Sequence, residues 1–179
     1  MPALRQALVA EFLKEADRQS ARESAGQFSS EFEGDYLGDL LEAIARDDDA
    51  RIVPGLVRML GSGATATSTL ARFGEVAVGL VLDAVEDYER IRSTDLAGAL
   101  MVLTDVFDGP MRGRLSDKSV RRSQRLVDAI LTKRQNDDLV VLFALDTAAA
   151  TRDPELVAIV ATIRDRGAVP GQAGSPNPA

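Results

Sequence analysis

The feature that most constrains the fold is a pair of apolar segments in residues 64–85, ATATSTLARFGEVAVGLVLDAV, joined almost without a loop. The spacing predicts a first helix with Leu70 and Phe73 on one side. Gly74 is expected to end this helix, because glycine adopts the left-handed conformation after a helix without steric cost. A second helix follows at once, so the segment predicts a tight helical hairpin.

The second helix of this hairpin has an apolar stripe that is expected to be buried. The stripe comprises Val76, Ala77, Leu80, Val81 and Val85. A hairpin of this size cannot cover both of its apolar sides by itself, so it needs another hairpin on each side. Stacking of hairpins in a row is the architecture of a helical solenoid.

The composition favours an all-α core. Hydrophobic residues make up 45% of the 179 residues and charged residues 27%, as in globular proteins generally, but aromatic residues reach only 4% and tryptophan is absent. The core must therefore consist of Leu, Val, Ile and Ala, which suit close helix packing better than a β-sandwich or barrel. A chain of this length is expected to form one domain with a single core.

The chain contains no cysteine and no histidine. The lack of cysteine excludes disulfides, thiolate metal sites and thiol nucleophiles. The lack of histidine removes the usual general base and the commonest metal ligand. No remaining nucleophile has a base at a fixed spacing, so we expect no enzymatic activity, no cofactor and no metal site.

The chain is expected to have three parts, none of them in a membrane. No segment reaches the roughly 18–20 uninterrupted apolar residues of a membrane span. Glu11 and Lys14 interrupt the amphipathic N-terminal segment before an export-signal core could form, which favours a cytoplasmic location. We expect a capping helix and connector at 1–34, a helical repeat domain at 35–167 and a disordered Pro/Gly-rich tail at 168–179.

Helical periodicity and end signals predict the other elements. Further helices are expected at 3–19, 36–46, 52–60, 93–107, 116–134, 137–149 and 154–166. Pro54 falls in the first turn of its helix, and Asp153 followed by Pro154 is a strong helix start. Residues 20–34 lose the helical period and are interpreted as a loop that Phe28 and Phe32 anchor to the body.

The same spacing predicts which sides of three of these helices are buried. In the first helix the apolar residues are Leu4, Leu8, Val9, Phe12, Leu13 and Ala16. In the helix at 93–107 they are Leu96, Leu100, Leu103 and Phe107. In the helix at 137–149 they are Leu139, Val140, Leu142, Phe143 and Leu145.

Four segments repeat a common apolar pattern: RIVPGLVRML (51–60), EVAVGLVLDA (75–84), RRSQRLVDAI (121–130) and ELVAIVATIR (155–164). Through STLARFGEVAVGLVLDAV, DDDARIVPGLVRML and TRDPELVAIVATI the chain resembles the HEAT-repeat family, including its bacterial lyase-like branch. Second helices in that family often open with an apolar residue, Pro, any residue and Leu, and VPGL at 53–56 matches this opening.

The resemblance covers about residues 35–166 and implies a right-handed α-α superhelix, or solenoid, of about four HEAT-like helical hairpins with an N-terminal capping helix. It also implies an Asp–Arg ladder between repeats, for which Arg92 is suitably placed. Second helices line the concave face in that family. The partner-contact residues implied there are Arg58, Asp83, Arg121, Arg122 and Arg125.

Two acidic clusters are interpreted as structural. Asp47, Asp48 and Asp49 follow a helix and point in different directions, so we expect a hydrated turn whose last acid caps the next helix rather than a metal site. A second cluster shares one helical face without a basic or hydroxyl partner at a fixed spacing, and is expected to be a hydrated face rather than an acid–base pair. Its members are Asp83, Glu86 and Asp87.

The clearest charged feature is a basic block at residues 112–134. It contains eight basic residues and two acids, a local charge of +6 in a chain of net −7, which leaves −13 for the rest. The basic residues are Arg112, Arg114, Lys118, Arg121, Arg122, Arg125, Lys133 and Arg134. An arc of about 100° on the predicted helix holds Lys118, Arg121, Arg122 and Arg125. The opposite side holds Val120, Leu126, Val127, Ile130 and Leu131.

This basic stripe is either a hydrated face or a surface for an anionic partner. Nucleic acid fits poorly, because the net charge of −7 opposes approach to phosphates and no aromatic residues are interleaved with the basic ones. An acidic protein surface, or the acidic part of a second copy, fits better.

The sequence therefore predicts a non-catalytic protein–protein interaction module, a scaffold or adaptor, that is a monomer or a weak homodimer. Two alternatives remain open. One is an immunity-type protein that neutralises a toxin by tight binding, which the acidic net charge permits. The other is a chromophore-lyase-like enzyme, which would need a pocket large enough for a tetrapyrrole with carboxylates converging in it.

Overall fold

The computed structural model describes residues 2–26, 37, 39–41, 43–44, 49–62 and 64–167. These residues form helices and turns and contain no strand, which confirms the predicted all-α class. The helices are α1 (Pro2–Ser24), α3 (Val53–Arg58), α4 (Ala64–Ala71), α5 (Glu75–Ala84), α6 (Ser93–Asp108), α7 (Asp117–Lys133), α8 (Asp138–Thr151) and α9 (Pro154–Gly167). Three short 3₁₀ turns are η1 (Ala50–Ile52), η2 (Leu60–Ser62) and η3 (Arg112–Arg114). Phe28, Phe32, Asp47, Asp48 and the predicted tail at 168–179 lie outside the described residues.

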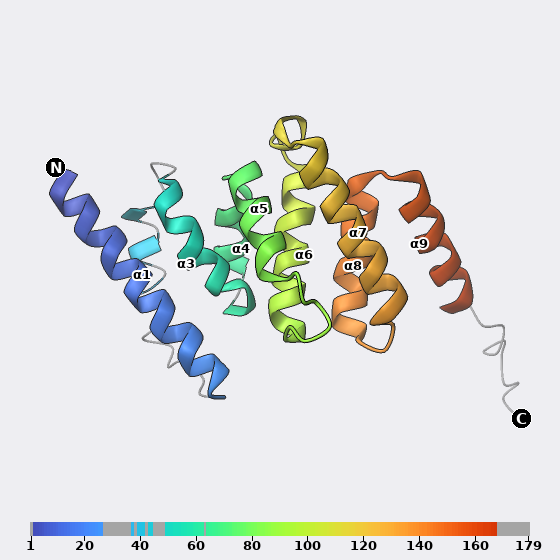
Figure 1. Ribbon diagram of the computed structural model, residues 1–179, viewed down its shortest axis with the longest axis horizontal. Coiled ribbons are helices and arrows are strands. Elements are labelled where there is room, and N and C mark those ends of the chain that lie inside the picture. The colour runs from blue at the N-terminus through green and yellow to red at the C-terminus, as the bar shows by residue number, and fades with distance from the viewer. Residues whose placement is uncertain are drawn as a thin grey trace, which may run out of the picture.

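The helices are arranged in two layers that run from α1 at one end to α9 at the other (Figure 1). Helices α1, α3, α5, α7 and α9 pack side by side in one layer, called here the front layer. Helices α4, α6 and α8 pack side by side in the back layer. The four segments that share the apolar sequence pattern thus become α3, α5, α7 and α9, all in the front layer.

The core is centred on α6, which contacts both α4 and α8. All four apolar residues predicted for this helix, Leu96, Leu100, Leu103 and Phe107, are buried. The helix also approaches the preceding hairpin closely, since a Cβ added to Gly98 would overlap the carbonyl group of Leu60. A glycine is therefore required at this position by packing rather than by backbone conformation.

Side-chain hydrogen bonds connect helices at a nearly constant separation along the chain. In the described residues, most long-range bonds span 38 to 47 residues, from Arg112 with the carbonyl of Ala150 to Thr147 with the carbonyl of Leu100. The bond between Gln124 and Asp153 spans 29 residues and is an exception. The contacts therefore repeat more regularly than the sequence pattern, whose segments start at irregular intervals.

Two arginines 42 residues apart in the chain have the same local pairing. Arg92 binds the carboxylate of Asp95 at 2.7 Å, and Arg134 binds that of Asp137 at 2.7 Å. Each arginine also reaches a different part of the chain: Arg92 lies 3.6 Å from Glu23, and Arg134 donates to the carbonyl of Tyr88. Arg92 was the expected ladder residue, and the repeated Arg-x-x-Asp spacing was the signal that would have identified Arg134.

Helix α1 is longer than the sequence predicted. It continues to Ser24 through residues that were assigned to the loop. Glu23 in the extra turn accepts a local hydrogen bond from Gln19, and tertiary contacts with Ser62 and Arg92 hold the turn against the body. Leu4, predicted to be buried, is 62% exposed, because it precedes the part of α1 that packs onto the body.

The predicted apolar stripe of α5 is only partly buried. Ala77, Val81 and Val85 are buried as expected, but Val76 is 50% exposed and Leu80 is 37% exposed. Val78 and Leu82 are buried instead. The predicted buried side of α5 is therefore wrong at Val76 and Leu80. Helix α5 is apolar around more than half of its circumference, so its contacts with α3, α4, α6 and α7 determine which side is buried.

Helix α8 shows the same kind of difference. Leu139 is 43% exposed and Leu142 is 56% exposed, although both were predicted to be buried. The side that packs onto α6 consists of small residues, and Thr147 donates a hydrogen bond to the carbonyl of Leu100 there. Its buried residues are Val140, Ala144, Thr147, Ala148, Ala150 and Thr151.

Three of the predicted helix-start signals are confirmed. Pro54 lies in the first turn of α3, and the side chain of Asp153 accepts the backbone N–H groups of Glu155 and Leu156 at the start of α9. Asp49 caps η1 by accepting the N–H of Arg51. The prediction for Gly74 is wrong: α4 ends at Ala71, and Gly74 is instead the N-cap of α5, with φ +51° and ψ −120°, a positive-φ conformation outside the left-handed helical region in which a side chain would be strained.

A matched pair of glycine substitutions tests this packing. Gly79→Ala in α5 should raise the free energy of unfolding by about 0.5–1 kcal/mol, because alanine favours the helix and a Cβ at Gly79 would meet nothing within 4 Å. Gly98→Ala in α6 should lower it by about 1–3 kcal/mol, because the added Cβ meets the backbone of Leu60. Urea unfolding of both variants gives the two values, and changes of the same sign would contradict the described packing.

Candidate functional site

The structure divides the basic block into residues that hold helices together and residues that do not. Four of the eight make hydrogen bonds or ion pairs to other parts of the chain: Arg112, Arg122, Lys133 and Arg134. The other four have no ion-pair or hydrogen-bond partner among the described residues: Arg114, Lys118, Arg121 and Arg125. Only the second group is free to bind another molecule.

Arg134 has a structural role at the start of the loop between α7 and α8. Its guanidinium donates to the carbonyl groups of Tyr88 and Ile91 at 2.9 and 3.0 Å, and to the carboxylate of Asp137 at 2.7 Å. The hydroxyl of Ser93 donates to the same carboxylate at 2.6 Å. The hydrogen bond from Ser93, with those from the Val140 N–H and Arg134, lowers the pKa of Asp137 below its ordinary value despite partial burial.

Arg112 has a similar role at the end of α8. Its guanidinium donates to the carbonyl groups of Ala150 and Thr151 at 2.9 and 2.8 Å. These carbonyls belong to the last turn of the helix, where intrahelical donors are missing and a cation is favoured by the helix dipole. Arg112 therefore has a structural role and is not available to a partner.

Three of the unpaired cations form a row on α7, called here the α7 cation row: Lys118, Arg121 and Arg125. They are spaced i, i+3 and i+7, so they lie on one side of the helix, and all three are exposed. The predicted opposite side is confirmed as the packed one, with Leu126, Val127, Ile130 and Leu131 buried and Val120 half-buried. The helix therefore presents fixed positive charge to solvent from a rigid support.

The remaining predicted contact residues form ion pairs between neighbouring helices of the front layer. Asp83 of α5 accepts a hydrogen bond from Arg122 of α7 at 2.7 Å, and Arg58 of α3 pairs with Asp17 of α1. Exposed pairs of this kind add little to stability. They do neutralise one another, so Arg58, Asp83 and Arg122 offer less net charge to a partner than the sequence indicated.

A second contact fixes α5 beside α7. The carboxylate of Glu75 accepts hydrogen bonds from the N–H of Ser116 at 3.0 Å and from the hydroxyls of Ser116 and Ser119 at 2.7 Å. Burial favours a higher pKa for Glu75, but these hydrogen bonds outweigh it and the pKa is lowered. With the Asp83–Arg122 pair further along, the two helices run parallel in a fixed register.

This register places an apolar strip beside the α7 cation row. On α5, Val76 and Leu80 lie between Glu75 and Asp83, the two residues that contact α7. On α7, the partners of these residues are Ser116 and Arg122, and Lys118 and Arg121 lie between them. The exposed apolar side chains are therefore level with two exposed cations. Sequence reasoning missed this arrangement because it assigned Val76 and Leu80 to the core.

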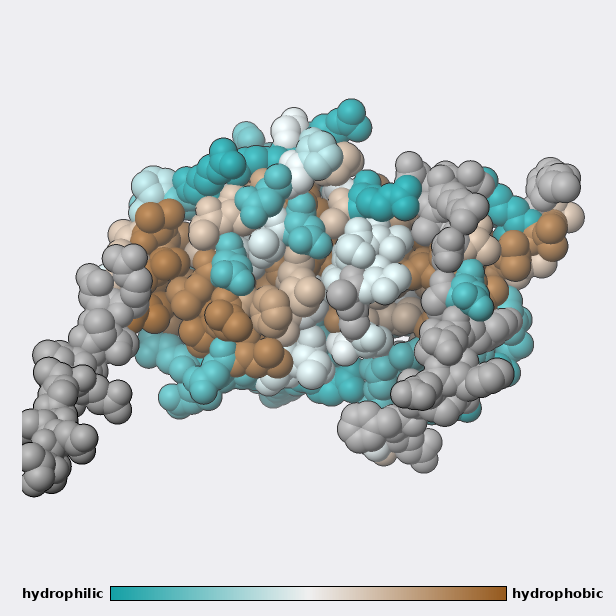
Figure 2. All heavy atoms as spheres, turned by 180° about the vertical axis from the view of Figure 1, so that it is seen from behind, coloured by the Kyte–Doolittle hydropathy of each residue, from teal (hydrophilic) through white to brown (hydrophobic). Residues whose placement is uncertain are grey.

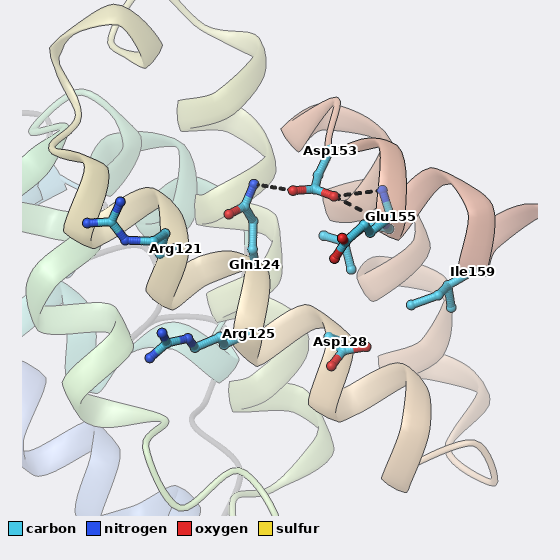
Figure 3. Close-up of a pocket in the computed structure, with 8 residues that line it drawn as sticks. Arg121, Gln124, Arg125, Asp128, Asp153, Glu155 and Ile159 are labelled. Atoms are coloured by element: carbon cyan, nitrogen blue, oxygen red, sulfur yellow. Dashed lines mark hydrogen bonds between the residues drawn. The ribbon is translucent and has the colours of Figure 1, made fainter.

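Shallow grooves lie on both sides of α7. A cavity of about 250 Å³ separates α7 from α9 (Figure 3), and its lining residues are Arg121, Gln124, Arg125, Asp128, Asp153, Glu155, Leu156 and Ile159. In Figure 3, Arg121 and Arg125 extend to one side of α7, whereas Asp153, Glu155 and Ile159 lie on the other. A second cavity, of about 300 Å³ between α5 and α7, is lined in part by Leu82, Tyr88 and again Arg125.

Of the two predicted acidic clusters, the first is described only at Asp49, because Asp47 and Asp48 lie outside the described residues. No group of three or more acidic side chains that could hold an ion occurs within the described ranges. Asp49 is instead paired with Arg51 and Arg5, and the hydrogen bonds from Arg51 hold its pKa well below the ordinary value. Asp83, Glu86 and Asp87 are exposed as expected, but they do not share one helical face, because α5 ends at Ala84, and Asp83 is paired with Arg122 and Asp87 with Arg90.

Comparison of the chain with protein-family models, with curated proteins and with solved structures gave no match. Among the described helices, none has the length and apolar character needed to cross a bilayer. What the chain binds is therefore inferred from the chemistry of its own surface.

The distinction between structural and unpaired residues of the basic block can be tested by measuring the free energy of unfolding of single variants. Arg134→Ala should lower the free energy of unfolding by about 2–3 kcal/mol, because it leaves two carbonyl groups and a carboxylate without their donor. Arg134→Lys should recover only part of this loss, since an ammonium cannot reproduce the guanidinium fork. Arg121→Ala, the control, should leave the urea midpoint unchanged. An equal loss for Arg121→Ala would contradict the division.

Acid sensitivity is a second test. Because the pKa of Asp137 is lowered in the folded state, its contribution to stability is complete above the ordinary aspartate pKa of about 4 and is lost as the pH falls through the folded-state value. Asp137→Asn should therefore destabilise the protein at pH 7 and flatten the decline in stability between about pH 5 and pH 2. Thermal melts across this range measure both effects, and an unchanged pH profile would contradict the assignment.

Proposed function

We propose that this protein is a non-catalytic protein-binding module of the scaffold or adaptor type, which binds an acidic partner through its front layer. The observation that carries the proposal is the α7 cation row: Lys118, Arg121 and Arg125 are exposed on a rigid helix and have no partner among the described residues. Fixed, uncompensated charge on one face favours association with an oppositely charged surface.

The architecture supports the proposal. We infer a HEAT-like α-α superhelix of four hairpins with α1 as the N-terminal cap, in which α3, α5, α7 and α9 are the second helices. The alternating layers and the contact separation of 38–47 residues support this, since HEAT and armadillo repeats are about 40–47 residues long. Arrays of this kind present extended surfaces for binding other proteins.

The charge distribution favours a protein partner over nucleic acid. Outside the basic block the chain carries a net charge of −13, which repels a phosphate backbone at distances where screening is incomplete. A folded protein with a local acidic patch can contact the α7 cation row without approaching the remaining acidic surface. The mixed apolar and charged lining of the neighbouring grooves is also typical of protein interfaces.

The proposal can be tested by charge reversal. Arg121→Glu/Arg125→Glu should reduce recovery of specific partners at least tenfold in quantitative affinity purification from the source cells, because the attraction becomes repulsion. Lys14→Glu/Arg18→Glu on α1 changes the net charge equally at the far end of the front layer and should leave recovery unchanged. Equal recovery with both variants, each shown to be folded by circular dichroism, would contradict the proposal.

A further inference from the structure

The strip formed by Val76, Gly79 and Leu80 on the outer side of α5 has no cover in the described structure. Scattered exposed apolar residues are normal on protein surfaces. Here, however, Val76 and Leu80 are one helical turn apart on the same side, with the half-buried Gly79 between them, so they form a continuous apolar strip.

Gly79 is the feature that points to an external occupant. Glycine in the interior of a helix is unfavourable, so such positions usually accommodate a close neighbour. Among the described helices, Gly98 of α6 accommodates the backbone of Leu60, and Gly55 of α3 accommodates the side chains of Phe12 and Leu13. At Gly79 an added Cβ would meet nothing within 4 Å. The space above this glycine is therefore available to another molecule.

Helix α1 shows what kind of element can fill the space at a helical glycine. It packs against α3, and Phe12 and Leu13 approach Gly55 so closely that an added Cβ would lie 2.8 and 2.9 Å from them. In the repeat pattern, Gly55 of the segment at 51–60 aligns with Gly79 of the segment at 75–84. The residues aligned with Val76 and Leu80, Ile52 and Leu56, are completely buried. Helix α1 lies beside α3 in the front layer, and its contacts with Gly55 show how a neighbouring helix fills the space at such a glycine, a space that is open at Gly79.

The charges around the strip determine which charged residues a bound molecule should carry and where they should lie. Lys118, Arg121 and Arg125 lie next to it without partners, whereas the nearby carboxylates of Glu75 and Asp83 are already bound by α7. Asp117 occupies the first turn of α7, where the helix dipole favours a carboxylate. Glu86 and Asp128 each line a groove with Arg125, and the exposed Glu155 of α9 lines the α7–α9 cavity on the side of α7 away from the strip. The acidic residues of an occupant are therefore expected near Lys118 and Arg121.

We infer that the outer face of α5 and α7 binds an acidic amphipathic helix from another protein. Its Leu or Phe side chains pack on Val76, Gly79 and Leu80, and its Glu or Asp side chains pair with the α7 cation row. This inference rests on the proposed protein-binding function and specifies the partner of the same surface. We call these six residues the α5–α7 seat: Val76, Gly79, Leu80, Lys118, Arg121 and Arg125.

A second copy of the chain is the competing occupant, because it has an acidic and apolar face of its own. Leu139 and Leu142 are exposed on α8, Asp146 lies one turn after Leu142 on the same helix, and Figure 2 shows hydrophobic side chains gathered over this part of the back layer. A separate helix is favoured because α8 is packed against α6, α7 and α9 and exposes only part of its surface, whereas a free helix can present its whole apolar side to the strip.

The test uses a displayed library of helical peptides, selected on the full-length protein. Enriched peptides should carry Leu or Phe at i, i+3 or i+4 spacing with Glu or Asp alongside, and chemically synthesised examples should bind with a measurable Kd in fluorescence anisotropy. Gly79→Leu should weaken their binding at least tenfold by filling the space, and so should Val76→Ser/Leu80→Ser and Arg121→Glu/Arg125→Glu. Leu139→Ser/Leu142→Ser on the back layer is the matched control and should bind as the wild type does.

Several outcomes would overturn the inference: no enrichment, enrichment of peptides without acidic residues, or equal binding to Gly79→Leu. Concentration-dependent self-association in sedimentation equilibrium that both Gly79→Leu and Leu139→Ser/Leu142→Ser abolish would overturn it as well, by assigning the seat to a second copy. If cellular partners depend on Arg121 and Arg125 but not on Gly79, the proposed function stands and only the seat is wrong. If no partner depends on either, both proposals fail.

Discussion

The packing of α6 between α4 and α8 is the interaction on which the rest of the structure depends. Four large apolar side chains of α6 are completely or almost completely buried, and each contributes about 2 kcal/mol by its removal from water. The close approach of Gly98 to Leu60 brings the preceding hairpin against the same helix. In the front layer α5 packs on α6 and α7 packs on α8, so both helices are positioned by this support.

Polar contacts then set the register of neighbouring hairpins. Glu75 with Ser116 and Ser119, and Arg134 with the carbonyls of Tyr88 and Ile91, are each satisfied by groups about 40 residues away in the chain. Because a buried polar group without a partner is costly, these contacts allow few alternative registers. The need to pair buried polar groups also explains why four of the eight basic residues bond to other parts of the chain, so that only the other four are available to a partner.

Much of the fold could be predicted from the sequence, for local reasons. The period of Leu96, Leu100, Leu103 and Phe107 specifies one buried side, and Asp153 before Pro154 specifies a helix start, because both depend on residues within one or two turns. The exposure of Val76, Leu80 and Leu142 could not be predicted. Helices α5 and α8 are apolar around much of their circumference, so periodicity alone does not choose the side that is covered.

By itself, the sequence determined that the chain is helical, where most helices begin and end, and that Lys118, Arg121 and Arg125 share one side of α7. Only the tertiary structure decided that Arg122 and Arg134 are paired, that these three cations are not, and that Gly79 faces open space beside them. The physical reason is distance along the chain. Helical geometry relates residues three or four apart, whereas each of these outcomes depends on which helix, some 40 residues away, packs alongside.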